Sequence, residues 1–363
     1  MWLINVATRN LECWVGDRIP YGKYAVLSHT WNTDSSQEMS FQEWKDEAKR
    51  KIWSNKLGYE KINKVIELAQ KSQITHVWVD TCCIDKTSSA ELSEAINSMF
   101  AWYQRSAVCY VFLADVSVAK PVIFKGASSP EDFRLYDLEE FKSSRWFTRG
   151  WTLQELLAPK TLFFYDKNWE GLGNYKKEDE KPFQAEEPSR AGYSFEGEDA
   201  HMDEGPEDGD STEAVETLVR DLSEATGIDT DYLETCGFSQ ASIAQRMSWA
   251  ANRQTTRIED QAYCLLGIFE INMPLLYGEE TKAFARLQEE IMKVSVDDSL
   301  FAWKWDPEYQ QKNLEISLLA PSPKAFGGMG HIEANIADES RYLADKEVKI
   351  ETYGLSMVST KIC

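Results

Sequence analysis

Residues 143–159, with the sequence SSRWFTRGWTLQELLAP, combine two arginines, two tryptophans and a single carboxylate, Glu155. Gly150 gives the backbone freedom just before a short predicted helix, and Pro159 ends that helix soon after it starts. A carboxylate on a short helix beside cationic and aromatic residues is a candidate catalytic group. The segment from Thr152 to Glu155 also fits a capping box, in which the glutamate only hydrogen-bonds the start of the helix. Both interpretations stay open on the local sequence.

The elements that must position Glu155 are strands. Short apolar runs predict buried strands at residues 24–28, 75–79, 107–113 and 161–165, and helical spacing of apolar residues predicts helices between them, for example at 59–70. This alternation predicts an α/β domain with a mainly parallel sheet flanked by helices. In such sheets ligands bind outside the carboxyl ends of the strands. Those ends carry residues 28–31, residues 80–85 and Asp115, so we expect a site there.

The charge of the chain limits its partners. A net charge of -21 argues against binding to nucleic acid or to an anionic membrane surface. Much of the negative charge lies in residues 176–216, which we interpret as a disordered acidic insert. Lys142, Arg145 and Arg149 provide a local basic spot for a small anionic ligand.

The cysteines and the apolar runs indicate a compartment. Seven cysteines are scattered without a repeated CxxC spacing, which suits a reducing cytosol better than a disulfide framework or a zinc site. The first residues, MWLIN, lack the pattern of a signal peptide, and no apolar run approaches the roughly 18 residues that span a bilayer. We therefore expect a soluble cytoplasmic protein with no membrane partner.

The remaining patterns complete the predicted organisation. An edge strand or hairpin is expected at residues 2–16, helices at 41–48, 217–224, 241–251, 257–269 and 279–294, a strand at 299–305 and strand-like alternation at 347–362. We expect an α/β domain at 1–175, the acidic insert at 176–216, and a mostly helical extension at 217–363 that packs on the first domain and ends in strands.

Three sequence blocks carry a family resemblance. They are YAVLSHTW at residues 24–31, VWVDTCCIDK at 77–86 and SRWFTRGWTLQELLAP at 144–159, and later blocks at 244–250, 259–267 and 273–279 extend the likeness to about residue 330. In these blocks the chain resembles the fungal HET (heterokaryon incompatibility) domain family. That resemblance implies a role in non-self recognition between fungal cells, in which activation triggers programmed cell death.

HET domains are in turn distantly similar to TIR domains, some of which hydrolyse NAD, and this implies a TIR-like (flavodoxin-like) sheet. The TIR motif Trp-Cys-x-x-Glu-Leu is similar to residues 151–156, with Thr152 in place of the cysteine, and the match makes Glu155 the candidate catalytic residue. The arginine that many TIR domains carry after the first strand has no counterpart here.

Cleavage of NAD would set a clear task for the site. Nicotinamide leaves as a neutral molecule, so the carboxylate of Glu155 would stabilise an oxocarbenium-like transition state. The two arginines of the motif would pair with the pyrophosphate, and a tryptophan would stack on a base. The predicted substrate-binding residues are Ser28, His29, Trp31, Asp80, Cys82, Arg145, Trp146, Arg149 and Trp151. We expect no metal and no cofactor, with NAD or a related nucleotide as the substrate.

Other interpretations remain. His29 with Cys82 or Cys83 could form a thiol nucleophile and its base, and Asp80 with Asp85 could bind a divalent cation. The leading alternative to an enzyme is a signalling module that self-associates or binds a receptor or incompatibility partner through residues 142–151. A concave pocket that holds Glu155 together with residues 28–31 would favour the enzyme, whereas a flat exposed face would favour the module.

Overall fold

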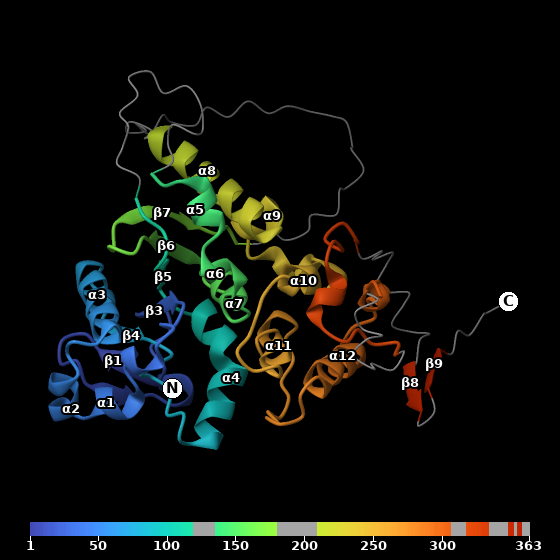
Figure 1. The fold of residues 1–363 in the computed structure, drawn as a ribbon, viewed down its shortest axis with the longest axis horizontal. Helices are drawn as coiled ribbons and strands as arrows, with labels where there is room; N and C mark the ends of the chain where they lie inside the picture. The colour runs from blue at the N-terminus through green and yellow to red at the C-terminus, as the bar shows by residue number, and fades with distance from the viewer. Residues whose placement is uncertain (119–134, 180–208, 306–316, 334–347, 352–353, 358–363) are drawn as a thin grey trace, which may run out of the picture.

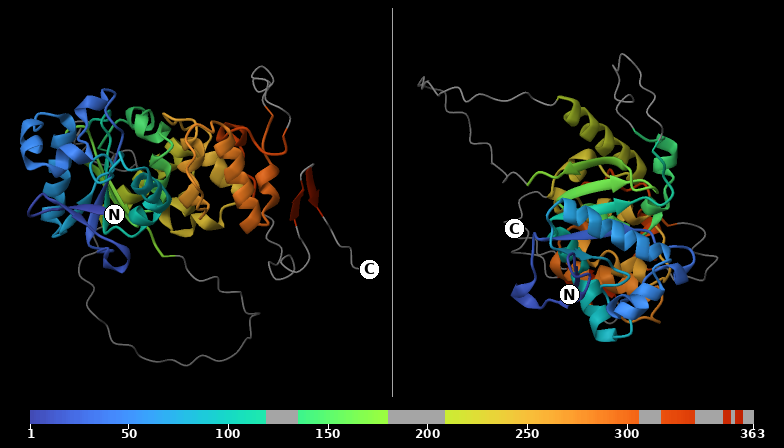
Figure 2. Two further views of the ribbon diagram at one scale, coloured as in Figure 1. Left: turned by 90° about the horizontal axis from the view of Figure 1, so that it is seen from below. Right: turned by 90° about the vertical axis from the view of Figure 1, so that its left-hand side faces the viewer.

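The computed structural model describes residues 1–118, 135–179, 209–305, 317–333, 348–351 and 354–357. A seven-stranded sheet with its flanking helices forms one part, and a helical region follows it along the long axis of the molecule (Figures 1 and 2). The strands are β1 (Trp2–Asn5), β2 (Leu11–Cys13), β3 (Tyr24–His29), β4 (His76–Trp78), β5 (Val108–Phe112), β6 (Thr161–Tyr165), β7 (Gly171–Lys176), β8 (Val348–Glu351) and β9 (Gly354–Met357).

The α-helices are α1 (Phe41–Lys45), α2 (Glu47–Ile52), α3 (Leu57–Lys71), α4 (Ser89–Gln104), α5 (Leu138–Lys142), α6 (Arg145–Thr148), α7 (Thr152–Leu157), α8 (Gly209–Thr226), α9 (Thr230–Glu234), α10 (Ile243–Ala250), α11 (Asp260–Tyr263) and α12 (Lys282–Val294). Short 3₁₀ helices are η1 (Gly16–Arg18), η2 (Ser35–Gln37), η4 (Gly237–Gln240), η5 (Leu266–Ile268), η6 (Asp298–Phe301) and η7 (Pro323–Phe326).

The sheet is mixed, with the strand order β2-β1-β4-β3-β5-β6-β7. The four inner strands β4, β3, β5 and β6 run parallel, while β1, β2 and β7 pair antiparallel. The prediction of a mainly parallel sheet was therefore right for the inner strands, and the edge strand or hairpin expected at residues 2–16 is the β1–β2 hairpin, whereas the antiparallel strand β7 was not predicted. The short connections explain the antiparallel β1–β2 and β6–β7 pairs, because a parallel pair needs a crossover of a dozen or more residues.

The order of the parallel strands creates a switch point. In chain order they are β3, β4, β5 and β6, but in the sheet β3 lies between β4 and β5. The chain therefore moves from β3 to one side and then returns to the other side, and the connections leave a crevice at the carboxyl ends of β3 and β5. All six residues of β3 are buried, as expected for a parallel strand covered on both faces.

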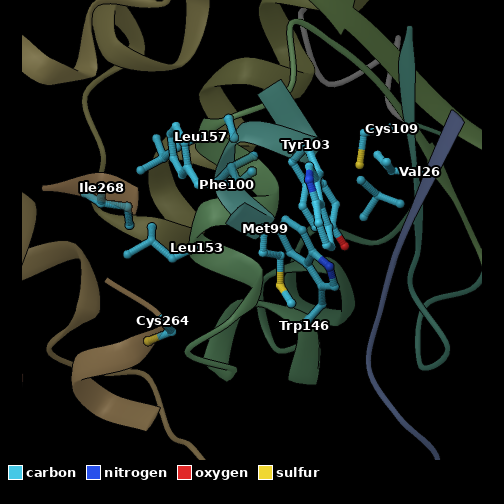
Figure 3. Close-up of a cluster of buried hydrophobic side chains, with 14 of the residues drawn as sticks. Val26, Met99, Phe100, Tyr103, Cys109, Trp146, Leu153, Leu157, Cys264 and Ile268 are labelled. Atoms are coloured by element: carbon cyan, nitrogen blue, oxygen red, sulfur yellow. The ribbon is translucent and has the colours of Figure 1, made fainter. Parts of the chain in front are cut away.

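Helices cover the two faces of the sheet. Helix α3 packs on β3 and β4, and its apolar residues Ile62, Val65, Ile66 and Ala69 are buried as the helical spacing predicted. Helices α4 and α7 pack on each other beneath the opposite face. Figure 3 shows this second layer, where Leu153 and Leu157 of α7 lie between Val26 and Cys109 of the sheet and Cys264 and Ile268 of the helical region.

The helical region packs tightly on α4. A Cβ atom on Gly267 in η5 would lie 2.1 Å from the Cβ of Phe100 in α4, so only glycine fits this contact. The predicted helix at 257–269 is broken into α11 and η5, and residues 299–305, predicted as a strand, contain η6 instead. The alternation at 347–362 was correctly identified as strand-forming, since β8 and β9 make a hairpin.

Most of the predicted acidic insert, residues 180–208, lies outside the described residues. Helix α8 begins at Gly209, before the predicted helix start, and packs on β7, where a Cβ on Gly173 would lie 3.0 Å from Leu218. In the part of the chain that the structure describes, every helix is too short or too polar to cross a membrane.

Candidate functional site

The structure brings Glu155 against Ser28, as the sequence predicted. The hydroxyl of Ser28, near the end of β3, donates a 2.5 Å hydrogen bond to Oε2 of Glu155 on α7. Nε1 of Trp146 donates to the same hydroxyl oxygen at 2.8 Å. Ser28 therefore connects two residues of the 143–159 motif to the carboxyl end of the central strand.

Glu155 lies in an apolar layer, with only 6% of its surface exposed. Burial raises the pKa of its carboxyl to about 8. The charge of Asp80 acts in the same direction, whereas the Ser28 hydrogen bond and the charge of Arg149 act against the shift. At neutral pH the carboxyl is mostly protonated, which is an unusual state for a glutamate and one found most often at functional sites.

The capping-box interpretation of Glu155 is wrong. The single hydroxyl hydrogen of Thr152 is directed at backbone carbonyl oxygens, with that of Trp146 at 2.5 Å and that of Arg149 at 2.9 Å, and α7 has no side-chain cap at its start. The carboxyl of Glu155 contacts Ser28 instead of the start of its own helix. The reason is tertiary, because the loop before α7 folds back and provides carbonyl groups that the Thr152 hydroxyl satisfies.

The neighbouring residue, His29, starts a second network on the other face of the sheet. Nε2 of His29 lies 3.0 Å from Oδ1 of Asp80, and Nδ1 lies 2.9 Å from the ammonium of Lys61 on α3. An ammonium can only donate, so Nδ1 accepts and the ring carries its hydrogen on Nε2 toward Asp80. Lys61 also donates to Glu38 at 2.6 Å, which completes a chain of four polar side chains.

Asp80 is held as a carboxylate at the end of this network. Burial opposes its ionisation, but the hydrogen bond and the electrostatic interaction with His29, the charge of Lys86 and a 2.7 Å hydrogen bond from Nε1 of Trp31 lower its pKa to about 2. The ammonium of Lys86 lies 3.8 Å from the centre of the Trp31 ring. The predicted residues His29, Trp31 and Asp80 thus form one connected group.

Arg145 lies at the edge of the same group. Its guanidinium donates to the carbonyl oxygen of Trp31 at 3.1 Å, and its backbone amide donates to Asp115 at 2.8 Å. Asp115 also accepts from the hydroxyl of Ser144 at 2.6 Å, so it anchors the start of α6. The carboxylate after β5 therefore positions Arg145.

Arg149 and Trp151 lie at the contact with the helical region. The guanidinium of Arg149 donates to Thr256 and the indole of Trp151 donates to Asp260, each at 3.3 Å. Gly150 is needed there, since a Cβ at this position would lie 2.6 Å from Thr255. Arg149 and Trp151 therefore join two parts of the fold through these contacts.

The cysteines after β4 are buried. Burial raises the pKa of the Cys82 thiol well above its ordinary value, which disfavours a thiolate nucleophile. Both ring nitrogens of His29 are already occupied by Lys61 and Asp80. Asp85, the other aspartate of the predicted cation site, instead accepts from the side chains of Gln42 and Thr87.

A cleft with a volume of about 540 Å³ opens at the switch point. Trp31 and Arg145 line it together with residues of α3 and of the β6–β7 turn. Glu155 and Ser28 are not among the lining residues. The predicted pocket was to hold Glu155 together with residues 28–31. The structure places Trp31 in a concave surface, whereas Glu155 is buried and does not reach it.

Several site residues carried no usable signal in the sequence. Lys61 and Glu38 lie in segments that read as an ordinary helix and loop, and Tyr103 lies in α4 with its hydroxyl 2.9 Å from the carbonyl oxygen of Leu27. Lys177 is buried and donates to the carbonyl oxygens of Leu156 and Leu157 at 2.7 and 2.6 Å, at the end of α7. Only the tertiary fold brings these groups to the site.

Comparison with known proteins tests the family resemblance of the sequence blocks at residues 24–31, 77–86 and 144–159. A family model described as heterokaryon incompatibility protein (HET) matches residues 24–155, and a domain of unknown function, DUF8212, matches residues 282–356. The vegetative incompatibility protein HET-E-1 of Podospora anserina is 38% identical over 303 residues, which cover 82% of this chain and 18% of that relative. No solved structure matches. The chain is a member of the fungal HET (heterokaryon incompatibility) family.

Proposed function

We propose that this chain acts in heterokaryon incompatibility, as a domain whose activation after non-self recognition leads to cell death. The match to the HET family model and the similarity to a vegetative incompatibility protein support this role. The chain spans only about a fifth of the length of that relative. That this chain responds to a recognition partner is therefore part of the proposal.

We further propose that the sheet is TIR-like and that Glu155 takes part in the hydrolysis of NAD to nicotinamide and ADP-ribose. The observation that carries this proposal is the contact between Glu155 and Ser28 at the carboxyl end of the central strand. Its raised pKa of about 8 supports a functional role, because burying a carboxyl next to the charge of Asp80 destabilises its ionised form. The structure must move to expose Glu155, since the cleft does not reach it.

The proposed reaction breaks the bond between C1′ of the ribose and the pyridinium nitrogen. The bonding electron pair goes to that nitrogen, so nicotinamide leaves without needing a proton. Water then adds to C1′ and releases one proton to solvent. The ionised form of Glu155 stabilises the positive charge that develops on the ribose, and Ser28 keeps the carboxylate oriented by its hydrogen bond.

The direct test is release of nicotinamide from NAD by the purified chain at high protein concentration. Glu155→Gln keeps the shape and the Ser28 contact but cannot ionise, so we expect a loss of about 100-fold or more. Because the active form of Glu155 is the carboxylate, the wild-type rate should rise as the pH increases through about 8. Equal rates for the two proteins, at equal thermal stability, would remove Glu155 from this role.

The burial of Glu155 also favours a second candidate, a module without enzymatic activity that signals by self-association or partner binding. In this case the role of Glu155 would be only structural, through its contact with Ser28 in the core. Expression in fungal cells separates the two candidates: a folded Glu155→Gln variant that still triggers cell death would support the module, whereas loss of cell death together with loss of NAD cleavage would support the enzyme.

A further inference from the structure

The cleft at the switch point is lined by cations, although the chain is strongly acidic. Lys61, Lys64, Arg145 and Lys167 line it, against a single carboxylate, Glu60. The whole chain carries a net charge of -21. A concave surface with an excess of positive charge attracts anions locally, even in a chain with a negative net charge.

Three of these cations are able to meet a ligand. Lys61 is committed to Glu38 and His29, but Arg145 is exposed and its guanidinium bonds one backbone carbonyl. Lys64 forms an ion pair at 3.3 Å with the exposed Glu67, its one ion-pair partner among the described residues. Lys167 is exposed and makes no ion pair with any residue in the described ranges.

The turn that carries Lys167 is held in one conformation. The buried carboxylate of Asp166 accepts from the backbone amides of Asn168 and Glu170, both at 2.8 Å, and from the amide of Val118 at 3.0 Å. Three amide donors to one carboxylate fix the turn at the edge of the cleft. A fixed turn loses little conformational entropy when a ligand binds.

The same turn presents an aromatic wall. Trp169 has a positive φ of 64°, which is rare for a bulky side chain. Its ring stacks on Phe112 at a centroid distance of 4.5 Å. Trp31, with 41% of its surface exposed, lines the cleft as well. The cleft therefore combines ammonium and guanidinium groups with flat aromatic surfaces.

We propose that this cleft is a binding site for a nucleotide, with Lys64, Lys167 and Arg145 holding its phosphates and Trp169 or Trp31 stacking on its base. Arginine and lysine donors suit phosphate oxygens, and aromatic rings suit a planar base. The place agrees with the rule that ligands of open α/β sheets bind where the strand order reverses.

This site does not depend on the proposed NAD cleavage. Glu155 does not line the cleft, and its contacts, Ser28 and Tyr103, face the other side of β3. Binding to the cleft can therefore be measured without turnover, with a nucleotide that contains no nicotinamide. ADP is such a probe, because it offers a base and two phosphates.

The experiment is calorimetric titration of the full chain with ADP, with inorganic pyrophosphate and with adenosine. We expect ADP to bind most tightly and to weaken as salt increases, pyrophosphate to bind more weakly and adenosine to bind least. Lys64→Gln and Lys167→Gln should each weaken ADP binding about 3- to 10-fold, and together about 30-fold or more. Lys71→Gln is the matched control, since Lys71 is exposed on α3 but does not line the cleft.

Two results would overturn the proposal. The first is absence of ADP binding to the wild-type chain, or binding that the Lys64 and Lys167 variants leave unchanged. The second is an equal loss of affinity in the Lys71 control, which would mean that only the general charge of the surface matters. Glu155→Gln should bind ADP as tightly as wild type, so a failure of NAD cleavage and a failure of this site give different results.

Discussion

Ser28 and His29 are neighbours in β3, but their side chains leave the strand on opposite faces of the sheet, and the two faces treat charge in opposite ways. On the Ser28 face, burial raises the pKa of Glu155 to about 8 and keeps this acid mostly protonated at neutral pH. On the His29 face, Asp80 is ionised, with a pKa of about 2, and is connected through His29 to the ion pair of Lys61 and Glu38.

The difference between the faces lies in their donors. Glu155 receives a hydrogen bond from the Ser28 hydroxyl, which has no charge and offsets the cost of burial only in part. Asp80 receives ring N–H donors from His29 and Trp31, and Oε1 of Glu38 receives the ammonium of Lys61, so charged or ring donors compensate the burial at these oxygens. Oε2 of Glu38 is buried and has no hydrogen-bond partner among the described residues. Two successive residues of β3 therefore contact opposite kinds of group: Ser28 contacts the mostly protonated Glu155, and His29 contacts the charged Asp80 and Lys61.

The largest expected effect comes from breaking the charged face. Lys61→Met leaves the buried Glu38 without its cation, and loss of one partner of a buried ion pair costs about 3–5 kcal/mol. Denaturant unfolding measures this loss in the free energy of unfolding. Lys64→Met, about one turn further along α3, removes a half-buried lysine whose ion-pair partner Glu67 is exposed, and should change that free energy by no more than about 0.5 kcal/mol. A similar loss in the free energy of unfolding for both variants would show that the network of Asp80, His29, Lys61 and Glu38 does not contribute to stability as proposed.

The next effect is a pH dependence on the neutral face. Below the pKa of an unfolded glutamate, about 4.3, Glu155 is protonated in both states and does not affect stability. As the pH rises to about 8, only the unfolded state loses this proton, so the folded state is progressively disfavoured. Relative to Glu155→Gln, the wild-type chain should lose on the order of 2–4 kcal/mol between pH 5 and pH 8. Parallel stability curves for the two proteins would show that the carboxyl is not buried as described.

The smallest effect is expected at the residue that connects this face to the strand. Ser28→Ala removes the donor to Glu155 and the acceptor for Trp146, and unsatisfied buried polar groups cost about 1–3 kcal/mol. Because the Ser28 hydrogen bond lowers the pKa of Glu155, its loss should raise that pKa further. Carboxyl-carbon NMR titration of Glu155 measures the shift. An unchanged pKa in a folded variant would mean that Ser28 does not support the ionised form.

The sequence predicted much of the framework. The inner strands and the long helix α3 were found from apolar runs and helical spacing, because both patterns reflect burial of one continuous apolar surface. The helix predicted at 257–269 forms only in two short pieces, α11 and η5, and the strand predicted at 299–305 was wrong, since tertiary packing decides the structure of such short apolar segments. The β1–β2 hairpin was expected, but its antiparallel pairing with β4 was not.

The candidate site shows the same limit. The polar residues at the strand ends and the family resemblance together predicted that Glu155 faces residues 28–31 across one crevice, and the contact with Ser28 forms, although the cleft that Trp31 lines does not include Glu155. These sequence features were not sufficient to place Arg149 and Trp151, whose partners Thr256 and Asp260 lie more than 100 residues further along the chain. A local pattern contains no information about such a distant partner.

By itself, the sequence determined the HET family, the α/β character and the side chains that gather at the carboxyl ends of the strands. The tertiary structure decided how those side chains are charged and whether they reach a cleft. The carboxyl of Asp80 beside His29 is ionised, whereas the carboxyl of Glu155 beside Ser28 is mostly protonated. Burial and hydrogen-bond donors set these two pKa values, and both depend on residues distant in the chain. The residues that surround the cleft come from α3, the loop after β3, the end of β5 and the residues after it, α6 and the β6–β7 turn, and only folding brings them together.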